Sequence, residues 1–400
     1  MIKINELINN GDAKKALEII NKALTNNSEK LNLYYLKAKA EFSLNHFSDC
    51  INSTSKIISY NNDDLASRNL RALCYFNIGN LKESIKDFKK IIQINPQFDQ
   101  PYNFIGATMF NSGKVKESIE YFIKCLKFNQ NNNAARNNLI NALTMHEVVN
   151  ENIYVKLNNQ INKLNKSFHY DQDLEGEIVK FYNNSNLIIK KNFNLLEYNG
   201  TQLYRRSSRY LNCSRHKKIF NEFKVIPKFC FSCFKIQISV KNVVDLIKLH
   251  IFFNQYNFKN NLTRKCMIEL RPKINDMYKG LIYCESLDQA ESIKGELKEK
   301  INLNFDMQIK KGCTEFGNSY PEYKKLDSKY SDVGKKWEPT VEENFDKKHP
   351  NLNIFRISNV SLKGLFLQDV LVFRNWLYFA KKVNDITYKK ISDDIFKSNF

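Results

Sequence analysis

The residues best suited to chemistry are six cysteines that lie between positions 213 and 313. Two of them form the motif Cys230-Phe-Ser-Cys233, and upstream Cys213-Ser-Arg-His216 is a second short clip. Together they read C-x2-H-x13-C-x2-C, a spacing typical of a tetrahedral zinc site, because each clip brings two ligands to one ion. The odd total of nine cysteines in 400 residues argues against a disulfide framework. We therefore predict a metal site around these clips.

The elements that must position these cysteines are the strands and helices of an α+β domain. Strand-like patterns run over residues 234–240, 266–271, 280–284 and 305–313, and apolar helical faces run over residues 243–253 and 287–297. The order is β-α-β-β-α-β, which is the ferredoxin-like plan. In that plan the spatial strand order is 4-1-3-2 and all neighbours are antiparallel. We predict a basic, cysteine-rich ferredoxin-like domain over residues 201–316.

The predicted topology brings four cysteines to one edge of the sheet. Cys233 begins the first strand, Cys266 begins the second, Cys284 ends the third and Cys313 ends the fourth. Because neighbouring strands lie about 4.8 Å apart, the four positions span only about 15 Å. The full predicted ligand set is Cys213, His216, Cys230, Cys233, Cys266, Cys284 and Cys313. Zinc is favoured, an all-cysteine iron–sulfur cluster is the alternative, and inert or redox-active thiols are the third interpretation.

Positive charge is concentrated beside the first clip. The formal net charge of the chain is +20, and residues 201–250 alone hold 11 basic and 2 acidic side chains. Such a focus favours nucleic acid or another polyanion as a partner. The predicted anion-binding residues are Arg205, Arg206, Arg209, Arg215, Lys217 and Lys218. The sequence contains no glycine-rich phosphate loop, so we predict no nucleotide cofactor.

A period of 34 residues runs through the first third of the chain. Small residues recur in register at Ala38, Ala72 and Gly106. Gly or Asn recurs at the inter-helix turn, at Asn45, Gly79 and Gly113. This pattern resembles the tetratricopeptide repeat over roughly residues 1–132. The resemblance implies helix pairs that stack into a solenoid, whose concave groove binds peptides or protein segments.

The same resemblance implies which side chains line that groove. They are Tyr35, Lys39, Phe42, Asn69, Phe76, Asn103 and Phe110, and they are the predicted partner-binding residues. Amides beside a phenylalanine column suit an extended peptide. The alternative is that the phenylalanines only pack between repeats. The family's clamp for chaperone tails needs basic residues where this chain has Gln100 and Phe104, so we do not expect that partner.

Four segments follow from these patterns. We predict a solenoid with a capping helix at 1–147, a helical connector at 148–200 and the cysteine-rich domain at 201–316. Residues 317–400 are predicted to be an irregular surface segment that includes one strand at 353–360 and one buried helix at 362–383.

The N-terminus has no signal-peptide pattern, and the longest apolar stretch is too short to span a bilayer. We therefore predict a cytoplasmic protein without a membrane partner.

The preferred function is a non-catalytic adaptor that captures a protein or peptide through its repeats and binds a metal in its basic domain. One alternative is a zinc or iron–sulfur enzyme or redox protein that acts on a substrate docked on the repeats. The other is a nucleic-acid-binding protein that uses the basic segment 204–228.

Overall fold

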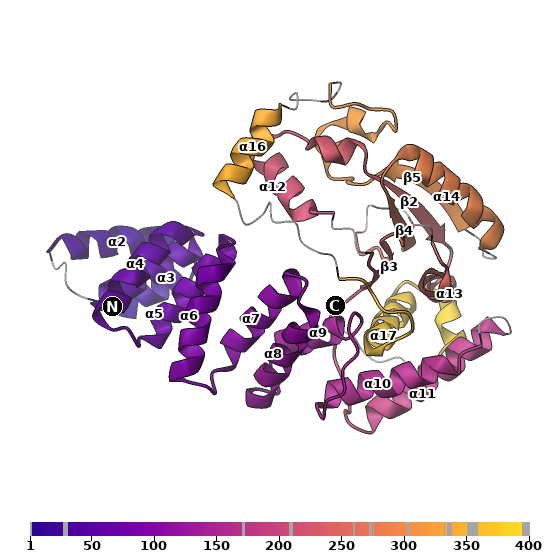
Figure 1. Ribbon diagram of the computed structural model, residues 1–400, viewed down its shortest axis with the longest axis horizontal. Coiled ribbons are helices and arrows are strands. Elements are labelled where there is room, and N and C mark those ends of the chain that lie inside the picture. Colours follow the sequence, from indigo (N-terminus) through magenta and orange to yellow (C-terminus); the bar gives the residue numbers. More distant parts are fainter. Residues whose placement is uncertain are drawn as a thin grey trace. The chain divides into compact units, whose positions relative to one another are not determined.

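The computed structural model describes residues 2–26, 31–169, 173–207, 211–258, 261–271, 274, 276–301, 305–331, 333, 338–349 and 359–393. The chain divides into two compact units (Figure 1). The first comprises Met1–Arg136 with Asp346–Ile354, and the second comprises Asn137–Phe345 with Phe355–Phe400. Among the described residues, no helix is both long and apolar enough to cross a membrane.

The first unit is built from helix pairs. Four pairs follow one another along the described chain, and α9 comes after them. The paired helices are α1 Ile2–Asn9, α2 Ala13–Asn26, α3 Leu31–Ser43, α4 Phe47–Tyr60, α5 Leu65–Asn77, α6 Leu81–Ile94, α7 Asp99–Asn111 and α8 Val115–Phe128. The boundary between the two units falls within α9, Asn133–Ala142. The helical solenoid predicted for this part of the chain is confirmed.

The 34-residue period reappears as backbone conformation at the turn inside each pair. Gly11, Gly79 and Gly113 have φ angles of 88°, 80° and 81°, and Asn45 has a φ angle of 60°. This left-handed region is open to glycine and tolerated by asparagine, whereas other side chains are strained there. The recurring Gly or Asn is therefore required by the turn geometry.

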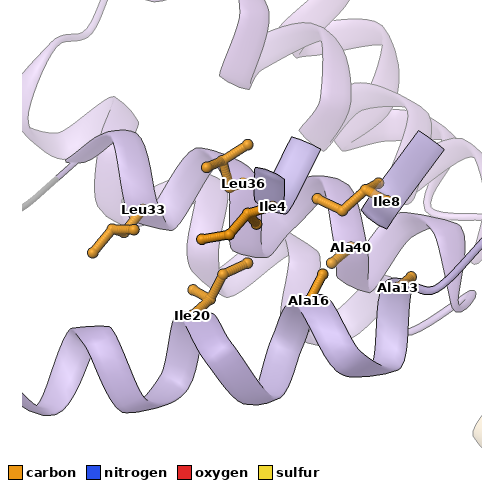
Figure 2. Packing of buried hydrophobic residues seen from close by; sticks show 8 residues of the cluster. All are labelled: Ile4, Ile8, Ala13, Ala16, Ile20, Leu33, Leu36 and Ala40. Atoms are coloured by element: carbon orange, nitrogen blue, oxygen red, sulfur yellow. The ribbon is translucent and has the colours of Figure 1, made fainter. Parts of the chain in front are cut away.

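Small residues allow the helices to approach each other closely. A Cβ atom on Gly106 of α7 would lie 2.6 Å from the ring of Phe122 on α8, so only glycine fits there without a shift. At the first junction, apolar side chains from α1, α2 and α3 interlock (Figure 2). They are Ile4, Ile8, Ala13, Ala16, Ile20, Leu33, Leu36 and Ala40. Stacking of neighbouring pairs thus buries the apolar faces that no single pair covers.

The second unit contains a five-stranded antiparallel sheet. Its strands are β1 Gln202–Arg205, β2 Phe234–Val240, β3 Arg264–Ile268, β4 Tyr278–Cys284 and β5 Phe305–Lys311. Their spatial order is β1-β3-β4-β2-β5. The run β5-β2-β4-β3 is the order expected from the sequence, and β1 extends it beside β3. The sequence patterns did not predict β1, because four residues are too few to show an alternation.

Helices cover one face of this sheet. Phe234, Ile236 and Ile238 of β2 are buried on the covered face, whereas Lys235 and Gln237 belong to the opposite face. Helix α13 (Val243–Gln255) packs against β3 and β4, and α14 (Leu287–Lys300) packs against β2, β4 and β5. The face that carries Lys235 is called the open face below.

Helix α17 (Leu367–Lys382) is the centre of the rest of the second unit. It is buried on most sides, as predicted for residues 362–383, and it contacts α10 (Ile153–Lys166), α11 (Leu174–Lys190), α13 and β1. The residues predicted as a connector therefore supply two helices that pack on α17. The remaining elements are α12 Cys213–Phe223, α15 Phe316–Ser319, α16 Pro339–Lys348, η1 Lys228–Phe231, η2 Pro321–Lys324 and η4 Ile386–Lys390.

Residues 317–350 were expected to form an irregular surface segment, and those of them that the structure describes are more ordered than that. They contribute η2, α16 and the last part of α15. Tyr323 and Phe345 within them are fully buried. Most of the strand predicted at 353–360 lies outside the described residues, because the structure does not describe residues 351–358.

Candidate functional site

A hollow in the first unit coincides with part of the predicted groove. It has a volume of about 500 Å³ and is lined by side chains of α3 and α5 together with Phe98. The lining residues are Tyr35, Lys39, Phe42, Ser43, Leu65, Ala66, Asn69, Leu70 and Phe98. Four of the seven predicted partner-binding residues are among them. Aromatic and aliphatic side chains form most of this wall, which suits an apolar side chain of a ligand.

Asn69 is the polar centre of this hollow. Its Nδ2 atom donates to Oε1 of Gln100 at 3.0 Å. Its Oδ1 atom is buried and has no hydrogen-bond partner within the part of the chain that the structure describes. A buried acceptor without a donor costs free energy, so this oxygen favours a ligand that brings an N–H group. Lys39 also lines the hollow, and its Nζ atom donates to Oδ1 of Asn5 at 2.6 Å.

The other predicted groove residues lie outside the hollow. Phe76 packs edge-on against Phe104 at 5.4 Å between ring centroids, and Phe104 stacks on Phe88 at 5.2 Å. Phe76 thus bridges two repeats, as in the packing alternative. Asn103 and Phe110 are half-buried on α7 and have contacts of their own.

The predicted convergence of cysteines at one sheet edge is wrong for Cys266. Strand β3 begins at Arg264, two residues earlier than predicted, so Cys266 pairs with Gly280 in the interior of β4. Cys284 ends β4 and pairs with Phe234, and four residues of strand correspond to roughly 13 Å. Both thiols are buried on the helix-covered face. They belong to the core.

The described residues contain no group of three or more His, Cys, Asp and Glu side chains placed to hold a metal ion. The predicted set of seven ligands is therefore not assembled as one site. His216 stacks on Phe229 with 5.3 Å between ring centroids. Zinc and an iron–sulfur cluster stay predictions from the sequence, without support from this arrangement.

Three other cysteines, Cys230, Cys233 and Cys313, lie in the segments that precede β2 and follow β5. Cys230 packs in an apolar cluster with Phe220, Phe316 and Tyr323, and Cys313 contacts the same cluster. Cys233 directly precedes β2, and its carbonyl oxygen accepts a hydrogen bond from the Gly312 N–H at 2.8 Å.

The surroundings of Cys230 and Cys313 oppose ionisation of their thiols. Burial, followed by the nearby Cys313 and Cys233, raises the pKa of Cys230. Burial and Glu315 raise the pKa of Cys313 to about 12. A reactive cysteine needs a lowered pKa, because the thiolate is the nucleophile. The environment of Cys230 and Cys313 therefore disfavours the reactive thiolate form of these two side chains.

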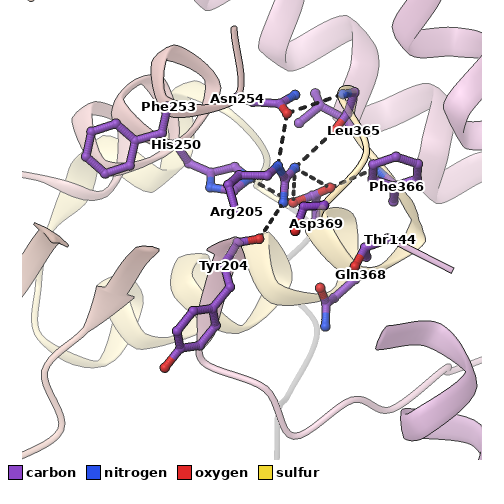
Figure 3. Close-up of polar contacts among 12 residues, drawn as sticks. Thr144, Tyr204, Arg205, His250, Phe253, Asn254, Leu365, Phe366, Gln368 and Asp369 are labelled. Carbon is purple, nitrogen blue, oxygen red and sulfur yellow. Dashed lines mark hydrogen bonds and ion pairs between the residues drawn. The ribbon is translucent and has the colours of Figure 1, made fainter. Parts of the chain in front are cut away.

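The basic segment does not form one anion-binding patch. Arg205 is buried, and its guanidinium contacts both carboxylate oxygens of Asp369, at 3.0 and 3.1 Å from Nη2 (Figure 3). Arg215 pairs with Glu342 at 2.8 Å, and Lys217 lies 3.9 Å from Glu315. Lys218 is exposed. These pairings leave nucleic-acid binding through the segment 204–228 without support.

The two remaining residues of the predicted anion-binding set are Arg206 and Arg209. Arg206 lines a hollow over the open face of the sheet. Arg209 lies outside the described residues. Arg206 is thus the member of the predicted set that the described structure places in the wall of this hollow.

Sequence reasoning missed a buried polar network around Arg205. Asp369 at the start of α17 also accepts a hydrogen bond from His250 Nε2 at 2.8 Å, and Asn254 Oδ1 accepts from Arg205 Nε at 2.9 Å (Figure 3). Burial and then Arg205 lower the pKa of His250 to about 4. Burial opposes ionisation of Asp369, but Arg205 and His250 outweigh it, and the net effect is a lowered pKa. This network holds β1, α13 and α17 together.

Comparisons with known proteins concern the repeats. A family model of the tetratricopeptide repeat matches residues 65–98 and 100–132. Similar solved structures include MamA, with 14% identity, a TM-score of 0.34, and coverage of 48% of this chain and 97% of that one. YrrB, described as a TPR protein with an unusual peptide-binding site, has 19% identity, a TM-score of 0.32, and coverage of 33% and 68%.

A third solved structure is the first TPR of Spaghetti (RPAP3) bound to the HSP90 peptide SRMEEVD. It has 21% identity and a TM-score of 0.28, and the match covers 29% of this chain and 92% of that one. No curated protein matches the sequence significantly.

Proposed function

We propose that this chain, which carries tetratricopeptide repeats at residues 65–132, is an adaptor that captures an extended peptide segment of a protein partner. The observation that carries the proposal is the unpartnered Oδ1 of Asn69 in an apolar hollow. A peptide offers both groups that this hollow lacks, which are a backbone N–H for the oxygen and an apolar side chain for the volume.

The proposed binding mode uses two contacts. Oδ1 of Asn69 accepts a hydrogen bond from the peptide backbone. An apolar side chain of the peptide enters among Tyr35, Phe42 and Phe98, which line the hollow. A volume of about 500 Å³ accommodates one large aliphatic or aromatic side chain with part of the adjoining backbone.

Substitution of Asn69 tests the proposal. Peptides are first selected from a displayed random library against the full chain, and their affinities are then measured for Asn69→Ala. We expect binding to weaken roughly fivefold, because one hydrogen bond contributes about 1 kcal/mol. Asn103→Ala tests the neighbouring predicted position in the same way. The matched control is Asn52→Ala on α4, which removes an exposed amide.

Two results would contradict this function. One is the selection of no peptide that binds saturably. The other is equal affinity of the wild type and Asn69→Ala while the circular dichroism of the repeats is unchanged. Loss of binding in Asn52→Ala would instead indicate that the partner contacts α4.

We also interpret β2–β5 of the second unit as a ferredoxin-like sheet. What supports this is the strand order β5-β2-β4-β3 together with one helix after β2 and one helix after β4. This interpretation makes the second unit an α+β module attached to the repeats, and the adaptor function needs no catalytic group in it.

A further inference from the structure

The open face of the sheet carries a large polar hollow that the proposed adaptor function does not use. It has a volume of about 1130 Å³ and its floor is formed by side chains of all five strands. Residues of the segments 211–214 and 312–318 line it together with residues of the segment 268–276. All of these lie in the second unit.

The charges around this hollow are unbalanced. Its lining has six cationic side chains, Arg206, Lys235, Lys265, Arg271, Lys279 and Lys310, and three carboxylates, Glu269, Asp276 and Glu315. Glu269 already accepts from Arg271 at 2.8 Å and from Lys279 at 3.2 Å. Asp276 accepts from the amide of Gln237 at 3.4 Å, and Glu315 lies beside Cys313. Among the described residues, neither Asp276 nor Glu315 forms a salt bridge with the other four cations.

Those four cations bond only to neutral groups among the described residues. Lys235 donates to the Gly312 carbonyl at 3.2 Å, Lys265 to Gln202 Oε1 at 3.0 Å, and Lys310 to Gln237 Oε1 at 3.2 Å. The Nε atom of Arg206 is buried and has no partner in the described part of the chain. The lining holds six cations against three carboxylates, and four of the cations form no salt bridge among the described residues, so the hollow favours an anionic ligand.

Two of these lysines oppose each other directly. Lys235 on β2 and Lys310 on β5 are cross-strand partners, a placement that is destabilising for like charges. Lys235 is only 7% exposed, and burial followed by Lys265 and Lys310 lowers its pKa to about 8, although Cys313 and Glu315 act in the opposite direction. The free protein therefore carries an electrostatic cost at this position that a bound anion would relieve.

We propose that the open face binds a small organic molecule bearing phosphate groups, through Lys235, Lys265, Lys310 and Arg206. Phosphate oxygens accept several charge-assisted hydrogen bonds at once, which matches a ring of donors on neighbouring strands. The volume is that of a nucleotide-sized ligand rather than of a single inorganic ion.

Tyr204 offers no free ring for base stacking in this hollow. The ring of Tyr204 is already covered, with the Arg206 guanidinium 4.6 Å and the Lys265 ammonium 5.3 Å from its centroid. Single-stranded RNA on such a sheet would need free aromatic faces. The arrangement therefore favours phosphate recognition of a small ligand over recognition of RNA.

Calorimetric titration of the full chain with sodium pyrophosphate at low ionic strength tests the proposal. We expect saturable binding that weakens about tenfold in Lys310→Gln and in Lys265→Gln, because each variant loses one charge-assisted contact. The matched control is Lys298→Gln, which removes the same charge from an exposed position on α14. Its affinity should equal that of the wild type.

A second variant keeps the test independent of folding defects. We expect Lys235→Met to raise the melting temperature of the free protein and to weaken pyrophosphate binding. Absence of saturable binding in the wild type would overturn the proposal, as would equal weakening by Lys298→Gln. The proposal would also fail if an oligouridylate bound far more tightly than pyrophosphate and depended on the same lysines, because the ligand would then be RNA.

Discussion

The buried histidine next to Asp369 leads to a prediction about acid sensitivity. His250 is 1% exposed, and its Nε2 atom contacts Asp369 Oδ1 at 2.8 Å. Arg205 already supplies the one positive charge that balances Asp369. A second proton on His250 would leave an uncompensated charge in the core, which is why its pKa falls to about 4. We expect His250→Gln to remove most of the acid destabilisation that this site causes.

The size of the effect follows from the two pKa values. An unfolded chain binds a proton at its histidines with a pKa of about 6.5, whereas folded His250 binds one only near pH 4. As the pH falls through this window, the unfolded state takes up a proton that the folded state cannot, so stability is lost. The full loss is about 3 kcal/mol, and about 2 kcal/mol of it occurs between pH 7 and pH 5.

Urea unfolding at pH 7 and pH 5 measures this loss. Trp376 lies on α17 in the second unit, so its fluorescence follows the unfolding of that unit. Trp376 is fully buried, with its ring 6.2 Å from that of His250. Between these pH values the wild type should lose about 2 kcal/mol more free energy of unfolding than His250→Gln.

The matched control is His169→Gln, at an exposed position in the same unit, which should keep the wild-type response. Equal acid sensitivity of the wild type and His250→Gln would refute the reasoning. So would an NMR titration that finds His250 protonated near pH 6.5.

Two further predictions concern the close glycine contact and the thiols. Gly106→Ala should lower the melting temperature of the repeats, at a cost of about 1–3 kcal/mol, because its Cβ would lie 2.6 Å from Phe122. Gly295→Ala is the matched control, since nothing lies within 4 Å of its Cβ, and it should not destabilise the chain. Cys230 should react slowly with a disulfide reagent at pH 7, because burial raises its pKa, and should react fully on unfolding. Elemental analysis that finds one zinc per chain, lost in Cys230→Ser, would restore the metal site that the sequence predicts.

The repeats could be predicted because their constraints are local. The turn between two helices needs a positive φ angle every 34 residues, and Gly79 and Gly113 show that need directly in the sequence. The same holds for Gly106, where the contact with Phe122 excludes any side chain. Which of the expected groove residues line a hollow depends on how neighbouring repeats stack. Phe76 was expected in the groove but packs on Phe104, because the sequence does not distinguish the two environments.

The predicted place of Cys266 at the edge of the sheet was wrong for a reason that sequence patterns cannot detect, whereas Cys233, Cys284 and Cys313 do lie at the end of the sheet where β2 begins. The face and height of a residue in a sheet depend on where its strand begins, and a start two residues earlier moves Cys266 from the edge into the interior. Strand ends are the least certain part of any pattern-based assignment. A prediction that several residues share one edge of a sheet therefore depends on the predicted end of every strand involved, and an error at any of these ends changes the result.

The order of basic residues along the chain does not show which of them share one surface, for a related reason. Arg205 and Arg206 are adjacent in sequence, but successive residues of a strand face opposite sides of the sheet. Arg205 therefore enters the core beside Asp369, whereas Arg206 reaches the open face. Lys235, Lys265 and Lys310 are dispersed over 75 residues and formed no visible cluster, yet strand pairing brings them to one face. Consecutive basic residues in a strand therefore point their charges to two different faces of the sheet. To find an anion site on one face, the basic residues at alternate positions of neighbouring strands must be considered together.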